Sequence, residues 1–550
     1  MQYQAFDGKT YELAPWIGQN VALLIPLATV ADPNVMTKLL AAFDAGYEYY
    51  QELTGQHPAD WGPTTLNGRT TIAVVDATCG AGCGYLGTRG IEILPDWFGS
   101  NLEGDFPSAR GFYDAMAENG STTSIVFYEL GRNFWFYGNQ LGDYGFTTGY
   151  AVVNRHYARE SAGVALDPQD TSGAYHNVSL PVIAATYFAS QGTTALNTLG
   201  NNQGIVNPSG SNGSADLAAA LLRIFHDHAG ADTYARFWQT LPGAPAAATA
   251  AQAFQNFATT AQKASGFDFS FLFKSGWSFK VGGASNEVLS AATSASGKHA
   301  VLGFSGNDTL NGTSNTDMLV GDFGNDSLYG FSGNDQLLGG PGHDLLNGGT
   351  GADLLGGSSG DDRYYVDHAS DKVSEGKGDG KDTIFTSVNY TLSSNAQVEV
   401  LATASSSGKT NLNLTGNSLG NTISGNAGTN RIAGKAGSDV LTGGGGPDAF
   451  IFDTAPNKNT NVDTIKDFVV KADKFWLDDA VYNGVGSSSA LKTGAFWIGA
   501  KAHDPSDRII YDSNTGALYY DADGNGASAQ IKFAQLAKGL KLTPDDFRIF

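Results

Sequence analysis

From Gly303 to Tyr365 the chain reads GFSGNDTLN GTSNTDMLV GDFGNDSLY GFSGNDQLL GGPGHDLLN GGTGADLLG GSSGDDRYY, which is seven consecutive units of nine residues. The sixth position of every unit is aspartate, at Asp308, Asp317, Asp326, Asp335, Asp344, Asp353 and Asp362. The eighth position is leucine in the first six units and tyrosine in the last. Each unit leaves only about three residues for a strand, whose middle side chain points inward. The period therefore predicts a parallel β-roll in which two units form one coil.

The same pattern predicts a calcium site in the turns. Ca²⁺ takes six to eight oxygen ligands in flexible geometry. Glycine at the first position, and at the fourth in most units, permits backbone conformations that direct carbonyl oxygens to one point, and aspartate adds a charged oxygen. The seven units carry nine Asp and one Arg, a net charge of −8. A metal-free β-solenoid would need asparagine ladders or a larger core instead, so we expect calcium binding to drive folding of the roll.

A second, weaker array follows between residues 416 and 452. Its units are GNSLGNTIS, GNAGTNRIA, GKAGSDVLT and GGGGPDAFI, and their sixth positions are Asn421, Asn430, Asp439 and Asp448. Asparagine offers only a neutral oxygen to a cation. We predict calcium at the two aspartate turns and leave the two asparagine turns open.

These patterns divide the chain into a mixed α/β domain and a β-rich remainder. The predicted parts are an α/β domain (1–289), a linker (290–302), a first roll (303–366), a β-rich interlude (367–415), a second roll (416–452) and a C-terminal domain (453–550). Hydrophobic periodicity predicts helices at 34–53, 122–137, 214–239 and 528–539, and strands at 21–27, 70–75 and 90–94.

The nine-residue units resemble the GGxGxDxUx repeats of RTX proteins, also called hemolysin-type repeats. Residues 360–394, residues 507–526 and the closing DDFRIF are similar to the C-terminal region of exported bacterial RTX proteins. That resemblance implies multiple Ca²⁺ ions as cofactors and export through a type I secretion apparatus that reads the C-terminus, hence an extracellular or cell-surface location. Asp521 and Asp523, in YYDADGNG, resemble a further calcium half-site, although a plain turn fits them nearly as well.

Composition excludes some partners. The net charge of −22 argues against binding of nucleic acid, whose phosphates need clustered Lys and Arg. We expect no membrane span, because no run approaches the roughly 20 apolar residues that a bilayer requires. The apolar run 21–31 follows a polar segment with more acid than base, so we interpret it as a buried strand rather than a signal peptide. Cys79 and Cys83, in CGAGC, form either a local disulfide or a free pair.

The segment SIVFYELGRNFWFY, residues 124–137, resembles the HExxH zinc helix of metallopeptidases. Glu129 matches the catalytic glutamate of that motif, but Tyr128 and Arg132 stand where the two histidines would be. A guanidinium offers no lone pair to a metal, so zinc is not expected here. Downstream, residues 147–160 resemble the helix that carries the third ligand, with Thr148 in the ligand position. The resemblance implies a metallopeptidase-like scaffold without a working zinc site.

Three interpretations of this domain follow. The first is a pseudo-peptidase that binds an extracellular peptide or glycan, with an anion site at Arg132, Arg155 and Arg159 unless these pair with Glu129 and Glu160. The second is an active extracellular hydrolase that uses relocated ligands around His156 and Glu160, with His226, Asp227 and His228 as further candidates. The third is a structural surface module. The aromatic run 134–137 lines a groove or packs in the core.

Overall fold

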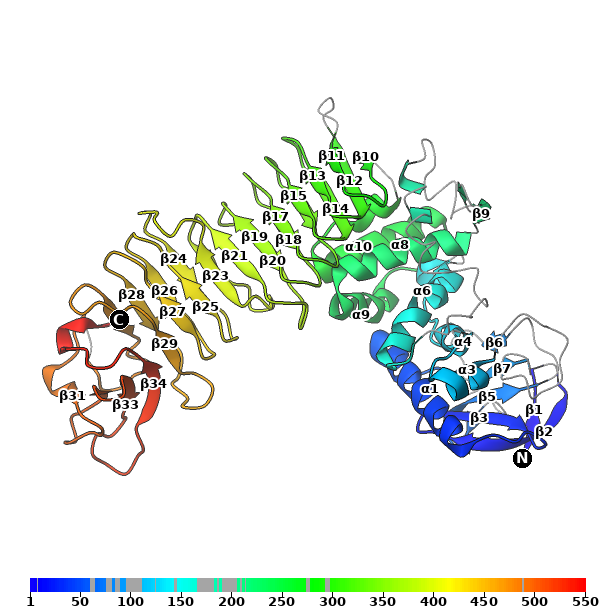
Figure 1. Ribbon diagram of the computed structural model, residues 1–550, viewed down its shortest axis with the longest axis horizontal. Helices are drawn as coiled ribbons and strands as arrows, with labels where there is room; N and C mark the ends of the chain where they lie inside the picture. Colours follow the sequence, from blue (N-terminus) through cyan, green and yellow to red (C-terminus); the bar gives the residue numbers. More distant parts are fainter. Residues whose placement is uncertain are drawn as a thin grey trace. The chain divides into compact units, whose positions relative to one another are not determined.

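The protein was analysed as a computed structural model, which describes residues 1–6, 8–59, 65–75, 82–84, 90–94, 111–123, 125–142, 146–165, 183–184, 187–189, 205–207, 210–212, 214–273, 277–291, 297–486 and 489–550. It divides into two compact units, Met1–Trp277 and Ser278–Phe550 (Figure 1). None of the helices in the described residues is long and apolar enough to cross a bilayer.

The first unit contains a mixed β-sheet of order β1-β2-β3-β5-β7-β6, with β4 paired to β5. Its strands are β1 (Gln2–Gln4), β2 (Thr10–Ile17), β3 (Val21–Pro26), β4 (Thr65–Leu66), β5 (Arg69–Val74), β6 (Gly82–Gly84) and β7 (Ile91–Ile93). A separate hairpin joins β8 (Ile205–Asn207) and β9 (Gly210–Asn212). Strands β3, β5 and β7 run parallel and are buried, which confirms the three strands predicted from the sequence.

Helices make up most of the rest of this unit in the residues that the structure describes. They are α1 (Pro33–Thr54), α3 (Phe112–Asn119), α4 (Ile125–Asn133), α5 (Gly138–Leu141), α6 (Phe146–Ser161), α8 (Ser214–Ala229), α9 (Ala231–Thr240) and α10 (Ala250–Ser265), with 3₁₀ turns η3 (Leu241–Gly243) and η4 (Phe269–Phe273). Helix α1 begins where Asp32 accepts a hydrogen bond from the Asn34 N–H at 2.7 Å. The helix predicted over 214–239 is two helices, because Gly230 adopts φ 75° between them.

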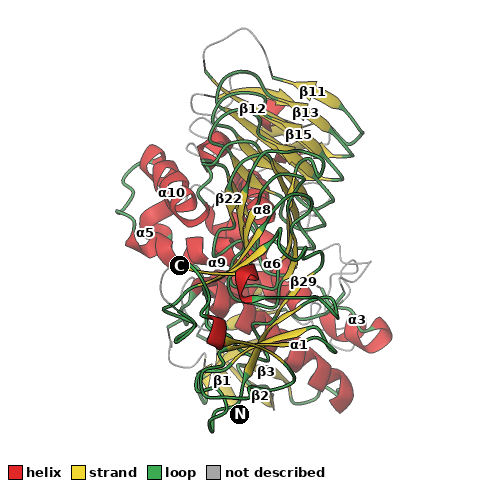
Figure 2. Cartoon of the chain, turned by 90° about the vertical axis from the view of Figure 1, so that its left-hand side faces the viewer, coloured by secondary structure: helices red, strands yellow, loops and turns green. Residues whose placement is uncertain are grey.

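The second unit is a parallel β-roll (Figures 1 and 2). One long sheet contains β11 (Val288–Ser290), β13 (Thr309–Asn311), β15 (Ser327–Tyr329), β17 (Leu345–Asn347), β19 (Arg363–Val366), β21 (Thr383–Thr386), β23 (Val400–Thr403), β25 (Thr422–Ser424), β27 (Val440–Thr442), β29 (Asp463–Ile465), β34 (Ile531–Gln535), β33 (Ala517–Tyr520), β32 (Ile509–Asp512) and β31 (Phe496–Ile498). The intervening strands form two shorter sheets. The first contains β10 (Trp277–Val281), β12 (Lys298–Ser305), β14 (Asp317–Phe323), β16 (Gln336–Leu338), β18 (Leu354–Gly356) and β20 (Lys372–Ser374). The second contains β22 (Tyr390–Thr391), β24 (Asn413–Thr415), β26 (Arg431–Ala433), β28 (Ala449–Phe452), β30 (Lys474–Leu477) and β35 (Phe547–Ile549), and two 3₁₀ turns, η5 (Thr493–Ala495) and η6 (Pro544–Asp546), complete the unit.

Each three-residue strand of the two arrays buries its middle residue, as the repeat predicts. Leu310 lies in register with Leu328, and the same file continues through Leu346 and Tyr364. These side chains are fully buried, and they belong to one cluster of buried apolar residues that extends from Leu289 to Ile549. The core is therefore a continuous column to which each unit adds one large side chain.

The roll extends beyond the repeats in both directions. It begins with β10 and β12, so the predicted boundary at 289 and the described ends of the predicted linker, 290–291 and 297–302, lie inside the roll. Strands that lack the nine-residue pattern can still pair with the first coil. The interlude and both arrays form one stack, since Tyr364 is followed in register by Ile384, Leu401 and Ile423. The helix predicted over 528–539 is wrong. Residues Ile531–Gln535 form β34, whose backbone pairs with β29 and β33, and this pairing overrides local helix propensity.

Candidate metal centre

The repeat aspartates form hydrogen-bonded rows along the roll. In one row Asp326 Oδ1 accepts the backbone N–H of Asp308, and Asp344 Oδ1 accepts that of Asp326, both at 2.7 Å. In the other row Asp335 Oδ1 accepts the N–H of Asp317 at 2.8 Å. Each bond joins residues 18 apart, so one oxygen of each carboxylate is fixed by the preceding coil.

The second oxygen of most of these carboxylates has no partner. Within the described residues, Oδ2 is buried and unpartnered in Asp308, Asp326, Asp335, Asp344, Asp353, Asp362, Asp439 and Asp448. None of these aspartates is more than 3% exposed. A buried charged oxygen costs several kcal/mol unless a cation or donor compensates it. The row of unpartnered oxygens therefore fits a row of cations.

Glycine at the first position leaves the space that such a cation needs. A Cβ atom on Gly330 would lie 2.4 Å from Asp335 Oδ2 and 2.6 Å from the carbonyl oxygen of Gly348. A Cβ atom on Gly339 would lie 2.2 Å from Asp344 Oδ2. A carboxylate and a carbonyl oxygen thus converge beside the first-position glycines Gly303, Gly312, Gly321 and Gly330. Hard oxygen donors in this arrangement fit Ca²⁺, and the sixth-position aspartates are the residues that would hold it.

Burial also changes the protonation of these carboxylates when no ion neutralises them. Desolvation raises the pKa of Asp326 to about 7, that of Asp335 to about 8 and that of Asp344 to about 9, from an ordinary value of 3.8. The N–H from the preceding coil lowers each pKa in part, and neighbouring aspartates raise it further. Without an ion the folded row therefore favours protons, so a bound cation and protons compete for the same oxygens.

The Asp317 turn differs from the other turns of the first array. Its unit, GTSNTDMLV, has threonine at the second position and asparagine at the fourth. Asp317 Oδ2 accepts hydrogen bonds from the N–H of Thr313 at 2.5 Å and from its hydroxyl at 2.9 Å, and Oδ1 lies 3.0 Å from His299 Nδ1. Both oxygens of this aspartate therefore have partners within the protein.

In the second array the amide nitrogens of the asparagines donate hydrogen bonds to backbone carbonyl oxygens, which a cation would contact in the aspartate turns. Asn430 Nδ2 donates to the carbonyl oxygens of Gly428 at 3.1 Å and Gly443 at 3.3 Å. Asn421 Oδ1 accepts the Asn417 N–H at 3.0 Å, and its Nδ2 donates to the Val398 carbonyl at 2.8 Å. Both amide atoms of Asn421 thus have hydrogen-bond partners, and so does the amide nitrogen of Asn430. Asn430 Oδ1, Asp439 Oδ2 and Asp448 Oδ2 are buried without a hydrogen-bond partner in the described residues.

Further acidic residues continue the rows beyond the positions that the sequence predicts. Asp371 accepts the backbone N–H of Asp353, and Asp382 accepts that of Asp362. In the second array, Asp463 accepts the N–H of Asp439, and Asp473 accepts that of Asp448. The spacings are 18, 20, 24 and 25 residues. Only Asp371 keeps the repeat spacing and could have been found by extending the period. Insertions in the intervening turns displace the other three.

Asp521 and Asp523 lie in the turn between β33 and β34. Asp523 N–H donates to Asp521 Oδ1 at 3.2 Å, and Asp523 Oδ2 accepts the Ser528 N–H at 3.0 Å. The two carboxylates thus share one turn, and both take part in hydrogen bonds of that turn. Calcium at this position stays a prediction.

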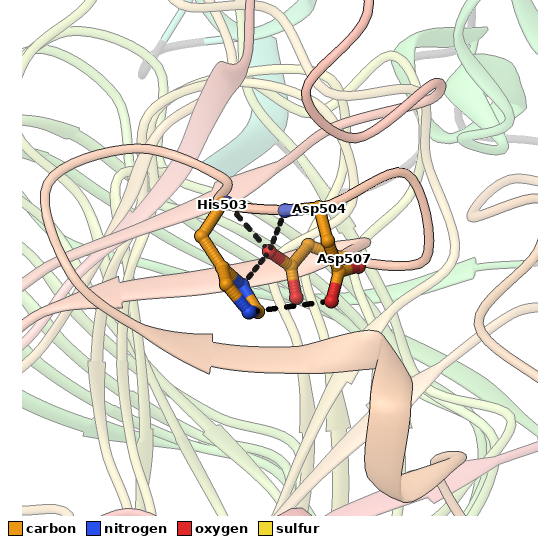
Figure 3. A group of neighbouring side chains, drawn as sticks. All are labelled: His503, Asp504 and Asp507. Carbon is orange, nitrogen blue, oxygen red and sulfur yellow. Dashed lines mark hydrogen bonds and ion pairs between the residues drawn. The ribbon is translucent and has the colours of Figure 1, made fainter.

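Another group of potential metal ligands precedes Asp521 in the sequence and consists of His503, Asp504 and Asp507 (Figure 3). Asp507 Oδ2 accepts the His503 N–H and lies 2.7 Å from His503 Nδ1, while Asp504 Oδ2 lies 3.3 Å from His503 Nε2. His503 and Asp504 are exposed at 48% and 41%. Hydrogen bonds and ion pairs within the group account for its arrangement.

The segment that resembles a metallopeptidase helix lies on α4, and the segment that resembles the third-ligand helix lies on α6. The two helices pack against each other. Glu129 is buried on α4, and its Oε2 lies 3.6 Å from Arg132 Nη1. On α6, Arg159 donates to the Val164 carbonyl at 2.6 Å and lies 3.7 Å from Glu160. Arg155 is buried on the same helix. Two of the three arginines proposed for an anion site thus form ion pairs with glutamates of their own helices.

The other candidates of this unit are in part engaged and in part outside the described residues. Asp227 accepts a hydrogen bond from Tyr157 at 2.6 Å and contacts Arg223 at 3.0 Å and His226 at 2.9 Å. Burial lowers the pKa of His228 to about 4, as expected of a neutral core histidine. Cys79 lies outside the described residues, and so do the side chains of His156 and Cys83.

The aromatic run of residues 134–137 packs mainly in the core. Phe134 and Tyr137 are fully buried and Trp135 is 4% exposed. The Tyr137 ring lies 4.8 Å from that of Trp238. These three rings therefore do not line an open groove.

The fold and the row of buried, unpartnered carboxylates define the second unit as a calcium-binding parallel β-roll. The family model of the RTX calcium-binding nonapeptide repeat matches residues 302–330, 329–364 and 415–449. The chain therefore carries RTX repeats, which bind calcium. Comparison with curated proteins found no match to the chain. Neither comparison supports the resemblance of residues 124–137 to a metallopeptidase helix.

Proposed function

We propose that the chain is an exported calcium-binding protein whose β-roll folds around Ca²⁺ outside the cell. The unpartnered Oδ2 atoms of the repeat aspartates carry this proposal. Each is anionic at neutral pH in an unfolded chain, and each becomes buried beside like charges when the roll forms. A cation that binds only the folded roll supplies the missing free energy.

Calcium titration of the metal-free full-length chain tests this proposal. Far-ultraviolet circular dichroism should gain β signal at roughly 10⁻⁴–10⁻³ M Ca²⁺, the range of extracellular calcium modules. Mg²⁺ is the matched control, because it demands a smaller octahedral site and gives up water reluctantly. A roll that is fully folded without calcium and indifferent to it would contradict the proposal.

The calcium range also supports export as the setting of this function. A roll that needs about millimolar calcium stays unfolded at the far lower calcium level of a cytosol and folds after export. Proteins with RTX repeats are typically secreted, and we propose that the C-terminal part, 453–550, is read by a type I secretion apparatus. Expression with and without such an apparatus, followed by assay of the medium, tests this. Equal amounts in the medium would argue against it.

For the first unit we propose a binding role without zinc. The ion pair between Glu129 and Arg132 supports it, since the glutamate of the motif is held by the residue that replaces a histidine. The competing proposal, a hydrolase with relocated ligands near His156 and Glu160, requires a stoichiometric metal. Metal analysis of the purified chain distinguishes them. Zinc that is lost in His156→Ala favours the hydrolase, whereas saturable binding of peptides or glycans without zinc favours the binding module.

A further inference from the structure

Three buried carboxylates meet where the first array ends. Asp362 belongs to the last unit of that array, whereas Glu375 and Asp382 come from the interlude and lie outside the residues that the repeat model matches. Their ligand oxygens all lie within 4.8 Å of one another. The three residues are 1%, 6% and 0% exposed. This is an unusual concentration of negative charge in the interior of the roll.

The register of the strands explains how Glu375 reaches this place. Gly356 at the end of β18 pairs with Ser374 at the end of β20, so Glu375 occupies the position that Gly357 holds one coil earlier. Other units place a first-position glycine there. Glu375 instead turns a side chain back toward the previous coil, where its Oε1 accepts the Gly357 N–H at 2.9 Å. Strand β20 is the last strand of its sheet.

Each of the three carboxylates has one oxygen fixed and one unpartnered. Asp362 Oδ1 accepts the Asp344 N–H at 2.7 Å, and Asp382 Oδ1 accepts the Asp362 N–H at 3.0 Å. Glu375 Oε1 also accepts the hydroxyl of Tyr364. The remaining oxygens, Asp362 Oδ2, Glu375 Oε2 and Asp382 Oδ2, are buried without a hydrogen-bond partner in the described residues. None of the three forms an ion pair with a Lys or Arg described in the structure.

We propose that Asp362, Glu375 and Asp382 bind a calcium ion at a site distinct in composition from the repeat turns. The site deepens the proposed function and rests on it, because it is part of the same roll. Three carboxylates can contribute to it, whereas a repeat turn relies on backbone carbonyls for much of its coordination. Since affinity for Ca²⁺ rises with the number of charged ligands in a fixed site, this junction binds calcium more tightly than the repeat turns do. It would then order the coil that joins the first array to the interlude.

The substitution Glu375→Gln tests the proposal on the full-length chain. Glutamine keeps the shape of the side chain and can still accept the Gly357 N–H, but it removes one charged ligand. We expect isothermal titration with CaCl₂ to show that the tightest binding step is weakened by roughly tenfold or more. Asp448→Asn is the matched control, since it removes one carboxylate from a repeat turn far along the sequence and should leave that step unchanged.

Terbium provides a second readout, because Tb³⁺ replaces Ca²⁺ in oxygen sites and is excited through a nearby tyrosine. Tyr364 contacts the site through Glu375. We expect Tyr364→Phe to reduce the Tb³⁺ emission of the first equivalent while the stoichiometry of calcium is kept. Glu375→Gln should reduce both that emission and the affinity.

The outcomes separate this proposal from the proposed function. A wild-type chain that folds with calcium, together with a Glu375→Gln variant whose tightest step is unchanged, would overturn the junction site alone. A wild-type chain that binds no calcium would overturn both. If Glu375→Gln fails to fold in saturating calcium, Asp382→Asn decides the question by the same titration, and an unchanged tightest step in that variant would overturn the site.

Discussion

Asn430 shows how a single atom distinguishes a calcium turn from a neutral one. Its backbone N–H donates to Asp448 Oδ1 at 2.8 Å, just as the aspartates of the first array donate along their rows. Its amide nitrogen, however, donates to carbonyl oxygens that would otherwise face a cation. Replacement of that nitrogen by a carboxylate oxygen turns donors into acceptors and leaves those carbonyls without a partner.

Asn430→Asp is therefore expected to create a calcium site. Titration calorimetry should show one more Ca²⁺ bound than in the wild type, and the calcium-free chain should be less stable because a new buried charge is uncompensated. Asn417→Asp offers a control, because Asn417 lies in the first unit of the same array but is not at a sixth position. An unchanged stoichiometry in Asn430→Asp would contradict this account of the asparagine turns.

The first-position glycines lead to a second prediction at the scale of single residues. In Gly339→Ala the new Cβ would lie 2.2 Å from Asp344 Oδ2 and occupy the space beside this oxygen. We expect a large loss of calcium affinity at this turn, measured by titration. Gly445→Ala is the matched control, since its Cβ would approach other atoms only to 3.4 Å and lies away from a carboxylate. Equal effects of the two substitutions would argue against a role for the glycine cradle.

At the scale of elements, the sequence predicts the features that recur with the nine-residue period and misses the features that lie outside it. The leucine file and the aspartate rows follow directly from the period, and the structure places both as expected. Asp382, Asp463 and Asp473 were missed, because insertions change the spacing while the coil continues to stack. Glu375 keeps the spacing but was missed because it stands where the repeat has its first-position glycine, for which the pattern predicts no side-chain ligand. The start of the roll was missed for a related reason, since β10 and β12 lack the pattern and are recruited by edge pairing with the first coil. In the first unit, periodicity predicts the central strands and helix α1. The pairing of Glu129 with Arg132, which the sequence left open as the alternative to an anion site, follows from their spacing of three residues on one helix.

The aspartate rows predict that rising pH lowers the stability of the calcium-free roll and raises its affinity for calcium. In the calcium-free roll the pKa values of Asp335 and Asp344 rise from 3.8 to about 8 and about 9, because burial disfavours their charged forms. The folded state then binds more protons than the unfolded state between pH about 4 and about 9, so its stability falls as the pH rises through this window. Calcium displaces those protons, so apparent calcium affinity rises over the same window.

Two measurements check these signs. Circular dichroism of the chain stripped of metal should show more β structure at pH 5 than at pH 8. Calcium titrations at the same two pH values should show tighter binding at pH 8. If the metal-free roll is equally folded at both pH values, the carboxylates are not the groups that oppose its folding.

At the scale of the whole molecule, the two units should respond differently to calcium. The core of the first unit is built from apolar and aromatic side chains such as Phe43, Tyr150 and Trp238, which need no ion to pack. The core of the second unit is a narrow column bordered by rows of buried carboxylates, so much of its stability must come from bound cations. The chain is thus expected to unfold in two separate transitions rather than one.

Removal of calcium from the full-length chain should therefore melt the second unit and spare the first. In calorimetry, the transition of the second unit should shift to higher temperature as calcium increases, since each tenfold rise in free Ca²⁺ above its Kd adds about 1.4 kcal/mol per ion bound only to the folded state. The transition of the first unit should not move. Limited proteolysis in a chelator should remove the roll and leave a resistant fragment that ends near Trp277. A single transition whose midpoint follows calcium as a whole would show instead that the first unit folds only when the roll does.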